Sequence, residues 1–93
     1  MKLIHMKNQV VIITGASSGI GKALAFEYGR KGAKIIITGR NEQNLLAAEA
    51  ELQAQGISAK GIVCDSASEE QSQAMVAKVV ELYGRIDLLI NNA

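Results

Sequence analysis

The feature that most constrains this chain is a run of apolar residues that ends in closely spaced glycines. Residues 10–13 read Val-Val-Ile-Ile, and Gly15, Gly19 and Gly21 follow. Consecutive β-branched residues are typical of a strand covered on both faces. Gly15 can adopt the positive φ of a tight turn, and Gly19 lets the backbone approach a ligand closely. Gly21 removes a side chain where a helix would meet the strand. The stretch therefore predicts a strand, a glycine turn and the start of a helix.

The start of this predicted helix is suited to binding an anion. Its first N–H groups have no helical partners, and the helix dipole is positive there. A glycine turn in front of such a helix is suited to a pyrophosphate. The spacing G-x-x-x-G-x-G differs from the general dinucleotide fingerprint, and Lys22-Ala23 does not complete a Walker-type phosphate loop. The alternative is a small-residue turn that binds nothing.

The stretch from Thr14 to Gly21 resembles the TGxxxGxG cofactor motif of the short-chain dehydrogenase/reductase family, and the resemblance extends over essentially the whole chain. It implies hydride transfer between a nicotinamide and an alcohol or carbonyl substrate. It also implies that the cofactor is bound by Thr14, Gly15, Ser17, Ser18, Gly19, Ile20 and Gly21.

The rest of the sequence alternates between strand and helix patterns. It predicts strands over residues 9–13, 34–38, 59–64 and 86–90, and helices over residues 20–31, 42–55 and between a Ser68 capping box and Gly84. This alternation predicts an α/β fold with a parallel sheet and right-handed crossovers. The resemblance implies a Rossmann-like sheet in the order 3-2-1-4, with helices on both faces, which is half of a doubly wound fold. Ligands bind such sheets beyond the carboxyl ends of the strands.

Each predicted helix has an apolar face that we expect to pack on the sheet. The face of the first helix includes Ile20, Ala23, Leu24, Ala25 and Phe26. The inward residues of the second are Leu45, Ala48 and Leu52. Those of the third are Met75, Val76, Val79, Val80 and Tyr83.

Arg40 follows the second predicted strand and indicates which dinucleotide is preferred. Proteins that bind a ribose 2′-hydroxyl commonly carry Asp or Glu at the end of that strand, where this chain has Gly39. A guanidinium can donate two hydrogen bonds to phosphate oxygens. Thr-Gly-Arg resembles the NADP-preferring members of the family, so we expect NADP rather than NAD. Ser18, however, is not the basic residue that some NADP users carry there, and a solvated arginine is the alternative.

The ends of the third and fourth predicted strands carry further candidates. Asp65 resembles the family's aspartate that accepts a hydrogen bond from the adenine amino group, and its alternative role is to cap the following turn. Cys64 is expected to pack near the adenine. Asn91-Asn92-Ala93 matches the beginning of the family's NNAG motif. The resemblance implies that Asn91 steadies the central strand and that backbone near Ala93 meets the adenosine ribose.

The catalytic residues of the family cannot be carried over to this sequence. The family uses a Tyr-x-x-x-Lys pair with a Ser. Here Tyr28 is followed four residues later by Gly32, and Tyr83 by Asp87. We therefore interpret residues 1–93 as one truncated NAD(P)-binding domain that lacks the catalytic half and is inactive alone. The alternatives are a non-catalytic nucleotide-binding module and a structural fragment.

Composition argues against several other classes of protein. Ten Lys and Arg against nine Asp and Glu give a net charge of +1, and aromatic residues are 3%, so we expect no nucleic-acid partner. The apolar runs are too short to cross a bilayer. The only cysteine, Cys64, excludes an intrachain disulfide and favours a cytoplasmic setting, and one histidine, His5, makes a metal site unexpected. We expect self-association through the open edge of the fourth strand, or pairing with a missing C-terminal half.

Overall fold

The computed structural model describes residues 6–92 and contains a four-stranded parallel sheet in the order β3-β2-β1-β4. Its elements are β1 (Val10–Thr14), α1 (Gly19–Arg30), β2 (Lys34–Gly39), α2 (Glu42–Ala54), β3 (Ala59–Val63), α3 (Glu69–Tyr83) and β4 (Leu88–Ile90). The predicted Rossmann-like α/β fold and strand order are confirmed. The element boundaries lie within two residues of those expected from the sequence.

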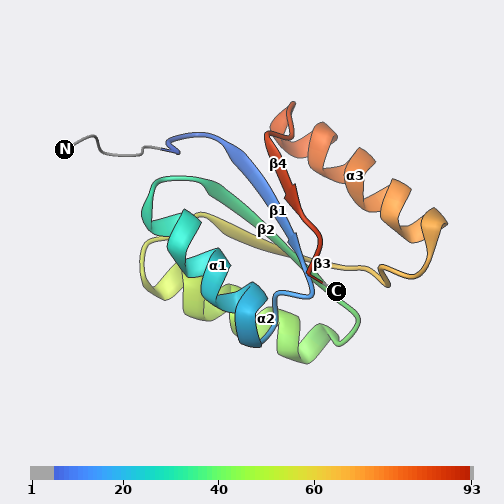
Figure 1. Cartoon of the computed structure of the whole chain (residues 1–93), viewed down its shortest axis with the longest axis horizontal. Coiled ribbons are helices and arrows are strands. Elements are labelled where there is room, and N and C mark those ends of the chain that lie inside the picture. Colours follow the sequence, from blue (N-terminus) through green and yellow to red (C-terminus); the bar gives the residue numbers. More distant parts are fainter. Residues whose placement is uncertain (1–5, 93) are drawn as a thin grey trace.

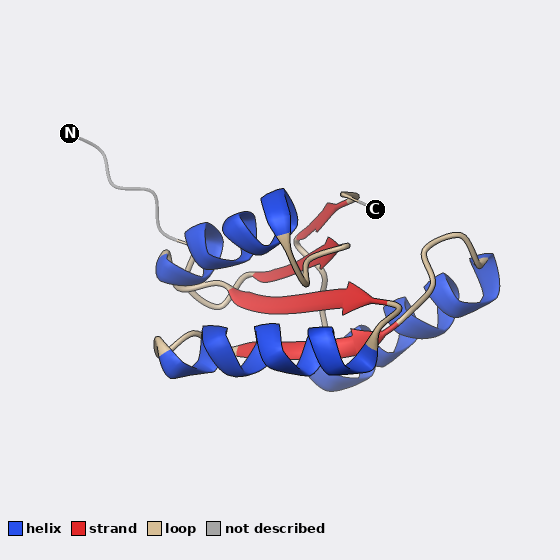
Figure 2. Cartoon of the chain, turned by 90° about the horizontal axis from the view of Figure 1, so that it is seen from below, coloured by secondary structure: helices blue, strands red, loops and turns tan. Residues whose placement is uncertain are grey.

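The helices cover the two faces of the sheet unequally. Figure 1 shows α1 and α2 on one side of the strands and α3 on the other, and Figure 2 shows the strands side by side in the sheet. This arrangement follows from the strand order, because a right-handed crossover to β4, on the far side of β1, must pass over the opposite face. The five residues of β1 are all buried, so the centre of the sheet contacts both layers.

One expectation for α1 is wrong. Ile20 is 74% exposed, and Ala23 is also exposed. The buried residues of α1 are instead Gly21, Ala25 and Gly29, which recur every fourth position. These small residues let the helix axis approach the sheet closely, and Ile20 lies about 100° round the helix from this stripe. The inner face of α1 is therefore selected by small size more than by hydrophobicity.

Two of the expected inward residues of α3 are also exposed. Met75 and Val79 are buried against the sheet, whereas Val76 is 36% and Val80 is 47% exposed. A helix that crosses a sheet without a neighbouring helix buries a narrow stripe with a spacing of four residues. Within residues 6–92, α3 is the one helix on its face of the sheet (Figure 1), so its flanks remain in contact with solvent.

Side-chain caps mark the starts of α2 and α3, and the one at Ser68 is predicted from the sequence. The side chain of Asn41 accepts a hydrogen bond from Asn44 N–H at 2.9 Å, and Ser68 Oγ accepts one from Gln71 N–H at 3.2 Å. Gly84 adopts a left-handed conformation, with a φ of +77°, at the end of α3. These caps fix where α2 and α3 begin relative to the ends of β2 and β3.

Candidate functional site

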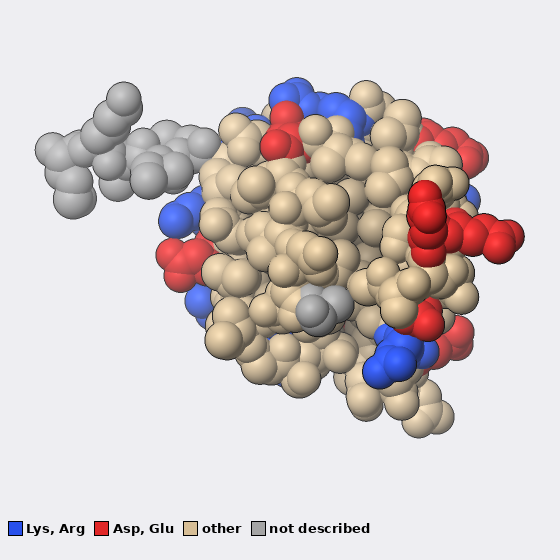
Figure 3. All heavy atoms as spheres, turned by 45° about the vertical axis from the view of Figure 1, so that its right-hand side comes forward, with Lys and Arg blue, Asp and Glu red and all other residues tan. Residues whose placement is uncertain are grey.

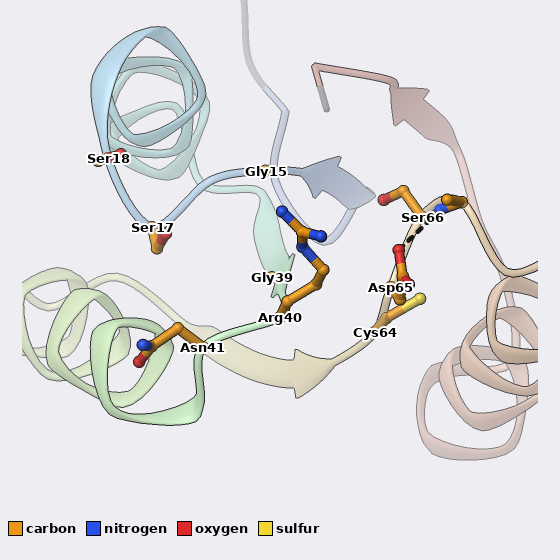
Figure 4. Close-up of a pocket in the computed structure, with 10 residues that line it drawn as sticks. Gly15, Ser17, Ser18, Gly39, Arg40, Asn41, Cys64, Asp65 and Ser66 are labelled. Carbon is orange, nitrogen blue, oxygen red and sulfur yellow. Dashed lines mark hydrogen bonds between the residues drawn. The ribbon is translucent and has the colours of Figure 1, made fainter.

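A cleft of about 840 Å³ lies at the carboxyl end of the sheet. The segments that follow β1, β2 and β3 line it, as Figure 4 shows. Its lining residues are Gly15, Ser17, Ser18, Gly39, Arg40, Asn41, Cys64, Asp65, Ser66 and Ala67. The volume lies in the range of roughly 300–1,000 Å³ that is usual for small-molecule sites. Parallel strands end on the same side of a sheet, which is why segments distant in sequence meet here.

Of the eleven residues that the sequence nominates, the cleft brings together Gly15, Ser17, Ser18, Arg40 and Asp65. Gly19, Ile20 and Gly21 form the first turn of α1. Thr14 and Asn91 do not line the cleft, and they bond each other where β1 and β4 end. The prediction for Ala93 falls outside the described residues.

The start of α1 is open. Ser18 is the N-cap residue, but its side chain makes no capping hydrogen bond, and the first turn contains no acidic residue. Gly19 has a φ of +62°, and a Cβ added there would meet no atom within 4 Å. The N–H groups of this turn are therefore available to an anion, which the helix dipole would also attract.

Gly21 performs the packing role expected from its position. A Cβ at this residue would lie 2.6 Å from Gly15 O and 2.6 Å from Asn92 Nδ2. The Asn92 amide also donates a hydrogen bond to Gly15 O at 3.2 Å. The absence of a side chain at Gly21 thus allows α1 to begin directly against the turn that follows β1.

Thr14 joins the end of β1 to the segment that follows β4. Its hydroxyl donates to Asn91 Oδ1 at 3.1 Å and accepts from Asn92 N–H at 2.9 Å. This contact joins Asn91 to the end of β1, and its role in steadying the central strand stays a prediction. Asn92, which contacts both Thr14 and Gly15, was not selected from the sequence, although the double asparagine offered a signal.

Arg40 extends from the end of β2 toward the turn at Gly15, as Figure 4 shows. It is exposed, and it forms no ion pair with any residue in the range 6–92. Gly39, which precedes it, contributes no carboxylate to the mouth of the cleft. The free guanidinium can therefore receive an anionic group at this edge of the cleft.

Asp65 contributes to the turn after β3 and also lines the cleft. Its Oδ1 accepts a hydrogen bond from Ala67 N–H at 3.0 Å, so one oxygen has the turn-capping role. Its Oδ2 makes no hydrogen bond to any described residue and remains available as an acceptor. Cys64, buried beside it, supplies an apolar wall.

Neither tyrosine is placed for chemistry in this cleft. Tyr28 and Tyr83 are half-buried and pack on the cores of the two faces. Burial, together with the charge of Glu49, raises the pKa of Tyr83 above its ordinary value. A general base works best with a pKa near the working pH, so this shift is in the wrong direction.

The described residues carry neither a metal cluster nor a membrane span. No group of three or more His, Cys, Asp or Glu side chains in the range 6–92 is placed to hold a metal ion. Over the same range, none of the helices has the length and apolarity needed to cross a bilayer.

Comparison with known proteins identifies relatives of this chain. Residues 9–93 match the family model described as short chain dehydrogenase. A human protein, dehydrogenase/reductase SDR family member 2, mitochondrial, is 41% identical over 88 residues, which are 95% of this chain and 31% of that protein. The chain spans about a third of the length of the curated relatives it matches.

Solved structures of similar proteins also include short-chain oxidoreductases. A variant of actinorhodin polyketide ketoreductase, crystallised with NADPH, matches with a TM-score of 0.89 and 41% identity over 91% of this chain and 33% of that one. A metagenomic short-chain oxidoreductase in complex with NADP matches with a TM-score of 0.89 and 39% identity over 94% of this chain and 39% of that one.

Proposed function

Because this chain belongs to the short-chain dehydrogenase family, we propose that its cleft binds the nicotinamide dinucleotide of an oxidoreductase, with NADP preferred over NAD. The reaction proposed for the protein is hydride transfer between the nicotinamide and an alcohol or carbonyl substrate. The observation that carries the proposal is the uncapped start of α1, which shares one cleft with Arg40, a residue without an ion pair within residues 6–92. The two neighbours that contain NADPH and NADP support the choice of cofactor class.

The pyrophosphate would lie over the backbone N–H groups of Ser18–Ile20. Those groups carry no side-chain cap, and the open space at Gly19 permits close approach of a phosphate oxygen. The N–H groups and the dipole of α1 would stabilise the two negative charges without any movement of the chain. Gly15 and Ser17 line the approach to this turn.

The 2′-phosphate would contact Arg40. A phosphate at the end of β2 meets no carboxylate, since Gly39 has no side chain, and Arg40 is free of ion pairs within the described residues. A charge-assisted, two-pronged hydrogen bond is the interaction that a guanidinium makes best with phosphate. NAD has a hydroxyl in place of the 2′-phosphate, so the charge of Arg40 would not strengthen its binding.

The adenine would lie between the end of β3 and the segment after β4. Asp65 offers Oδ2 as an acceptor for the adenine amino group, and Cys64 offers an apolar surface. We assign the adenosine ribose to backbone near Ala93. The 93 residues thus bind and orient the dinucleotide, and the nicotinamide, when bound, carries the hydride. We expect no hydride transfer from these residues alone, because they contain no Tyr-x-x-x-Lys pair.

The test of the site is a titration of the 93-residue chain with NADPH, followed by nicotinamide fluorescence. Gly19→Val should abolish binding, because the side chain fills the diphosphate space and residue 19 has a positive φ. Gly56→Val is the matched control, since Gly56 also has a positive φ and open surroundings but lies in the turn after α2. If Gly19→Val binds NADPH as well as the parent, the site lies elsewhere.

The test of cofactor preference is Arg40→Ala. We expect NADPH binding to weaken by about 1.5–3 kcal/mol, the scale of a charge-assisted hydrogen bond, while NADH binding stays nearly unchanged. Arg30→Ala, in the last turn of α1, removes the same charge from outside the cleft and should affect neither. Equal losses for both cofactors would contradict the assignment of the 2′-phosphate.

We further propose that residues 1–93 act as one dinucleotide-binding unit whose β4 edge pairs with another strand, from a second copy or from the remainder of a longer protein. Leu89 in β4 is 52% exposed, and β4 is the outer strand of the described sheet. In Figure 3, the charged side chains surround this side of the molecule and leave its middle uncharged. The buried, unpaired Cys64 supports a reducing, cytoplasmic setting.

A further inference from the structure

The side chain of Gln71 does not close the capping box that its spacing predicts. In a capping box, the third residue of the helix returns its side chain to the N–H of the N-cap residue. Here the N–H of Ser68 donates to Asp65 O at 2.9 Å. Gln71 Oε1 is thereby free to accept a hydrogen bond from Asp65 N–H at 2.8 Å.

Asp65 is consequently held at three of its polar atoms. Its N–H is bound by Gln71, its carbonyl by Ser68 N–H, and its Oδ1 by Ala67 N–H. The preceding residue is also fixed, because Cys64 N–H donates to Gly39 O at 2.9 Å. These bonds restrict both the backbone and the first side-chain torsion of Asp65, and they leave Oδ2 as the unused acceptor in the cleft.

We propose that Gln71 is a positioning residue that aims the Asp65 carboxylate and so gives the cleft its selectivity for a base bearing an exocyclic amino group. The inference rests on the proposed function, in which this cleft holds a dinucleotide. Gln71 is exposed and does not line the cleft, so it acts through Asp65 and not by contact with the ligand.

The start of α3 does not depend on the Gln71 side chain. The cap uses the Gln71 backbone N–H and the Ser68 hydroxyl, and both remain when the side chain is shortened. Gln71→Ala therefore removes the brace on Asp65 and keeps the helix. Gln73→Ala is the matched control, because Gln73 is an exposed glutamine of the same helix that bonds Glu69 and not Asp65.

The experiment compares NADPH with its hypoxanthine analogue, which has no exocyclic amino group. We expect the parent chain to prefer NADPH by at least about tenfold, the lower end of the scale of one hydrogen bond to a charged acceptor. In Gln71→Ala this preference should fall to about threefold or less, through weaker NADPH binding, with analogue binding unchanged within about twofold. Gln71→Glu, which keeps an acceptor oxygen, should retain the parent's preference for NADPH, and so should Gln73→Ala.

Amide hydrogen exchange provides a readout without ligand. The Asp65 N–H should exchange faster in Gln71→Ala than in the parent, while amides in the middle of α3 keep their rates. Gln71→Met, which preserves side-chain length but replaces the amide oxygen with a weakly accepting thioether, should behave as Gln71→Ala does and serves if the alanine variant folds poorly.

The outcomes separate the two proposals. If the parent binds NADPH and the ratio of the two affinities is the same in Gln71→Ala, the positioning role is refuted and the cofactor site stands. Equal losses for both ligands would also refute it, since they indicate general damage to the cleft. If the parent binds neither ligand, the proposed function is refuted and the positioning role falls with it.

Discussion

Two buried threonines offer a matched test of what holds β4 to the sheet. Thr14 and Thr38 are partners in the register of β1 and β2, and they are 7% and 0% exposed. The Thr14 hydroxyl bonds Asn91 Oδ1 and Asn92 N–H. The Thr38 hydroxyl has no hydrogen-bond partner among the described residues. Replacement by valine, which has nearly the same shape, should therefore have opposite effects at the two positions.

The magnitudes follow from the bonds. Thr14→Val leaves Asn92 N–H without its acceptor, which costs about 1–3 kcal/mol, and also loses a bond worth about 1 kcal/mol. Asn92 is only partly buried, so we expect the free energy of unfolding to fall by about 2 kcal/mol. Thr38→Val removes a buried hydroxyl whose desolvation is uncompensated, and should raise that free energy by about 1 kcal/mol.

Urea unfolding followed by far-UV circular dichroism is the assay, at a protein concentration where sedimentation detects monomer. The midpoint should move down for Thr14→Val and up for Thr38→Val, with the slope unchanged in both. The Thr14 variant should in addition lose hydrogen-exchange protection in β4 before the rest of the sheet. A Thr14→Val variant as stable as the parent, or equal destabilisation by both substitutions, would refute the reasoning.

Three further predictions concern other parts of the chain. The side-chain hydrogen bond from Arg85 holds the pKa of Asp87 below its ordinary value. This carboxyl therefore contributes stability above its unfolded pKa, and that stability is lost as the pH falls through the folded pKa. Asp87→Asn should flatten the acid side of a curve of unfolding free energy against pH. Gly21→Ala places a methyl group 2.6 Å from a backbone oxygen and should lower the free energy of unfolding by about 1–3 kcal/mol. An unchanged urea midpoint would contradict this prediction. Leu89→Lys should reduce self-association measured by sedimentation, whereas Val63→Lys on the opposite edge should not.

Most of the backbone arrangement could be predicted because its signals are local. The β-branched runs at residues 10–13 and 35–37 and the glycine after each helix mark where elements begin and end. The strand order came from the family resemblance, and the structure confirms it. Once that order is known, the meeting of Gly15, Arg40 and Asp65 in one cleft follows from parallel topology.

The burial of helix residues is as predicted for α2, whose expected inward residues Leu45, Ala48 and Leu52 are all buried, but not for α1 and α3. Ile20 and Val80 are strongly apolar but exposed, whereas Gly21 and Gly29 are buried. Hydrophobicity alone predicts that Ile20 and Val80 are core residues. The distance between a helix and its sheet, however, decides which face of the helix can pack on the sheet. That distance depends on contacts between elements and is not encoded in the period of one helix.

The hydrogen bonds that complete the site were also beyond the sequence. Asn92 bonds a strand 78 residues away in the chain, and Gln71 bonds Asp65 because Ser68 N–H has another acceptor. Such contacts depend on side-chain rotamers and on the paths of loops. The spacing of residues in the sequence is compatible with more than one of these arrangements. The capping-box pattern at Ser68 predicted the cap correctly and the partner of Gln71 wrongly.

The two edges of the sheet show why Leu89 is the position to charge. At the β3 edge, α2 supplies partners to the outward backbone groups: Glu49 Oε2 accepts from Gly61 N–H at 2.6 Å, and Gln53 Nε2 donates to Ala59 O at 3.0 Å. A strand that approached β3 would have to displace both side chains. At β4, the one side-chain contact with a strand backbone group within residues 6–92 is that of Thr14 Oγ1 with Ile90 O at 3.4 Å, and the Thr14 hydroxyl proton is directed to Asn91 Oδ1 instead. An unprotected edge beside an exposed leucine favours addition of a strand. A lysine at position 89 puts a charge in that contact, so a Leu89→Lys variant that self-associates as strongly as a self-associating parent would exclude the β4 edge as the contact.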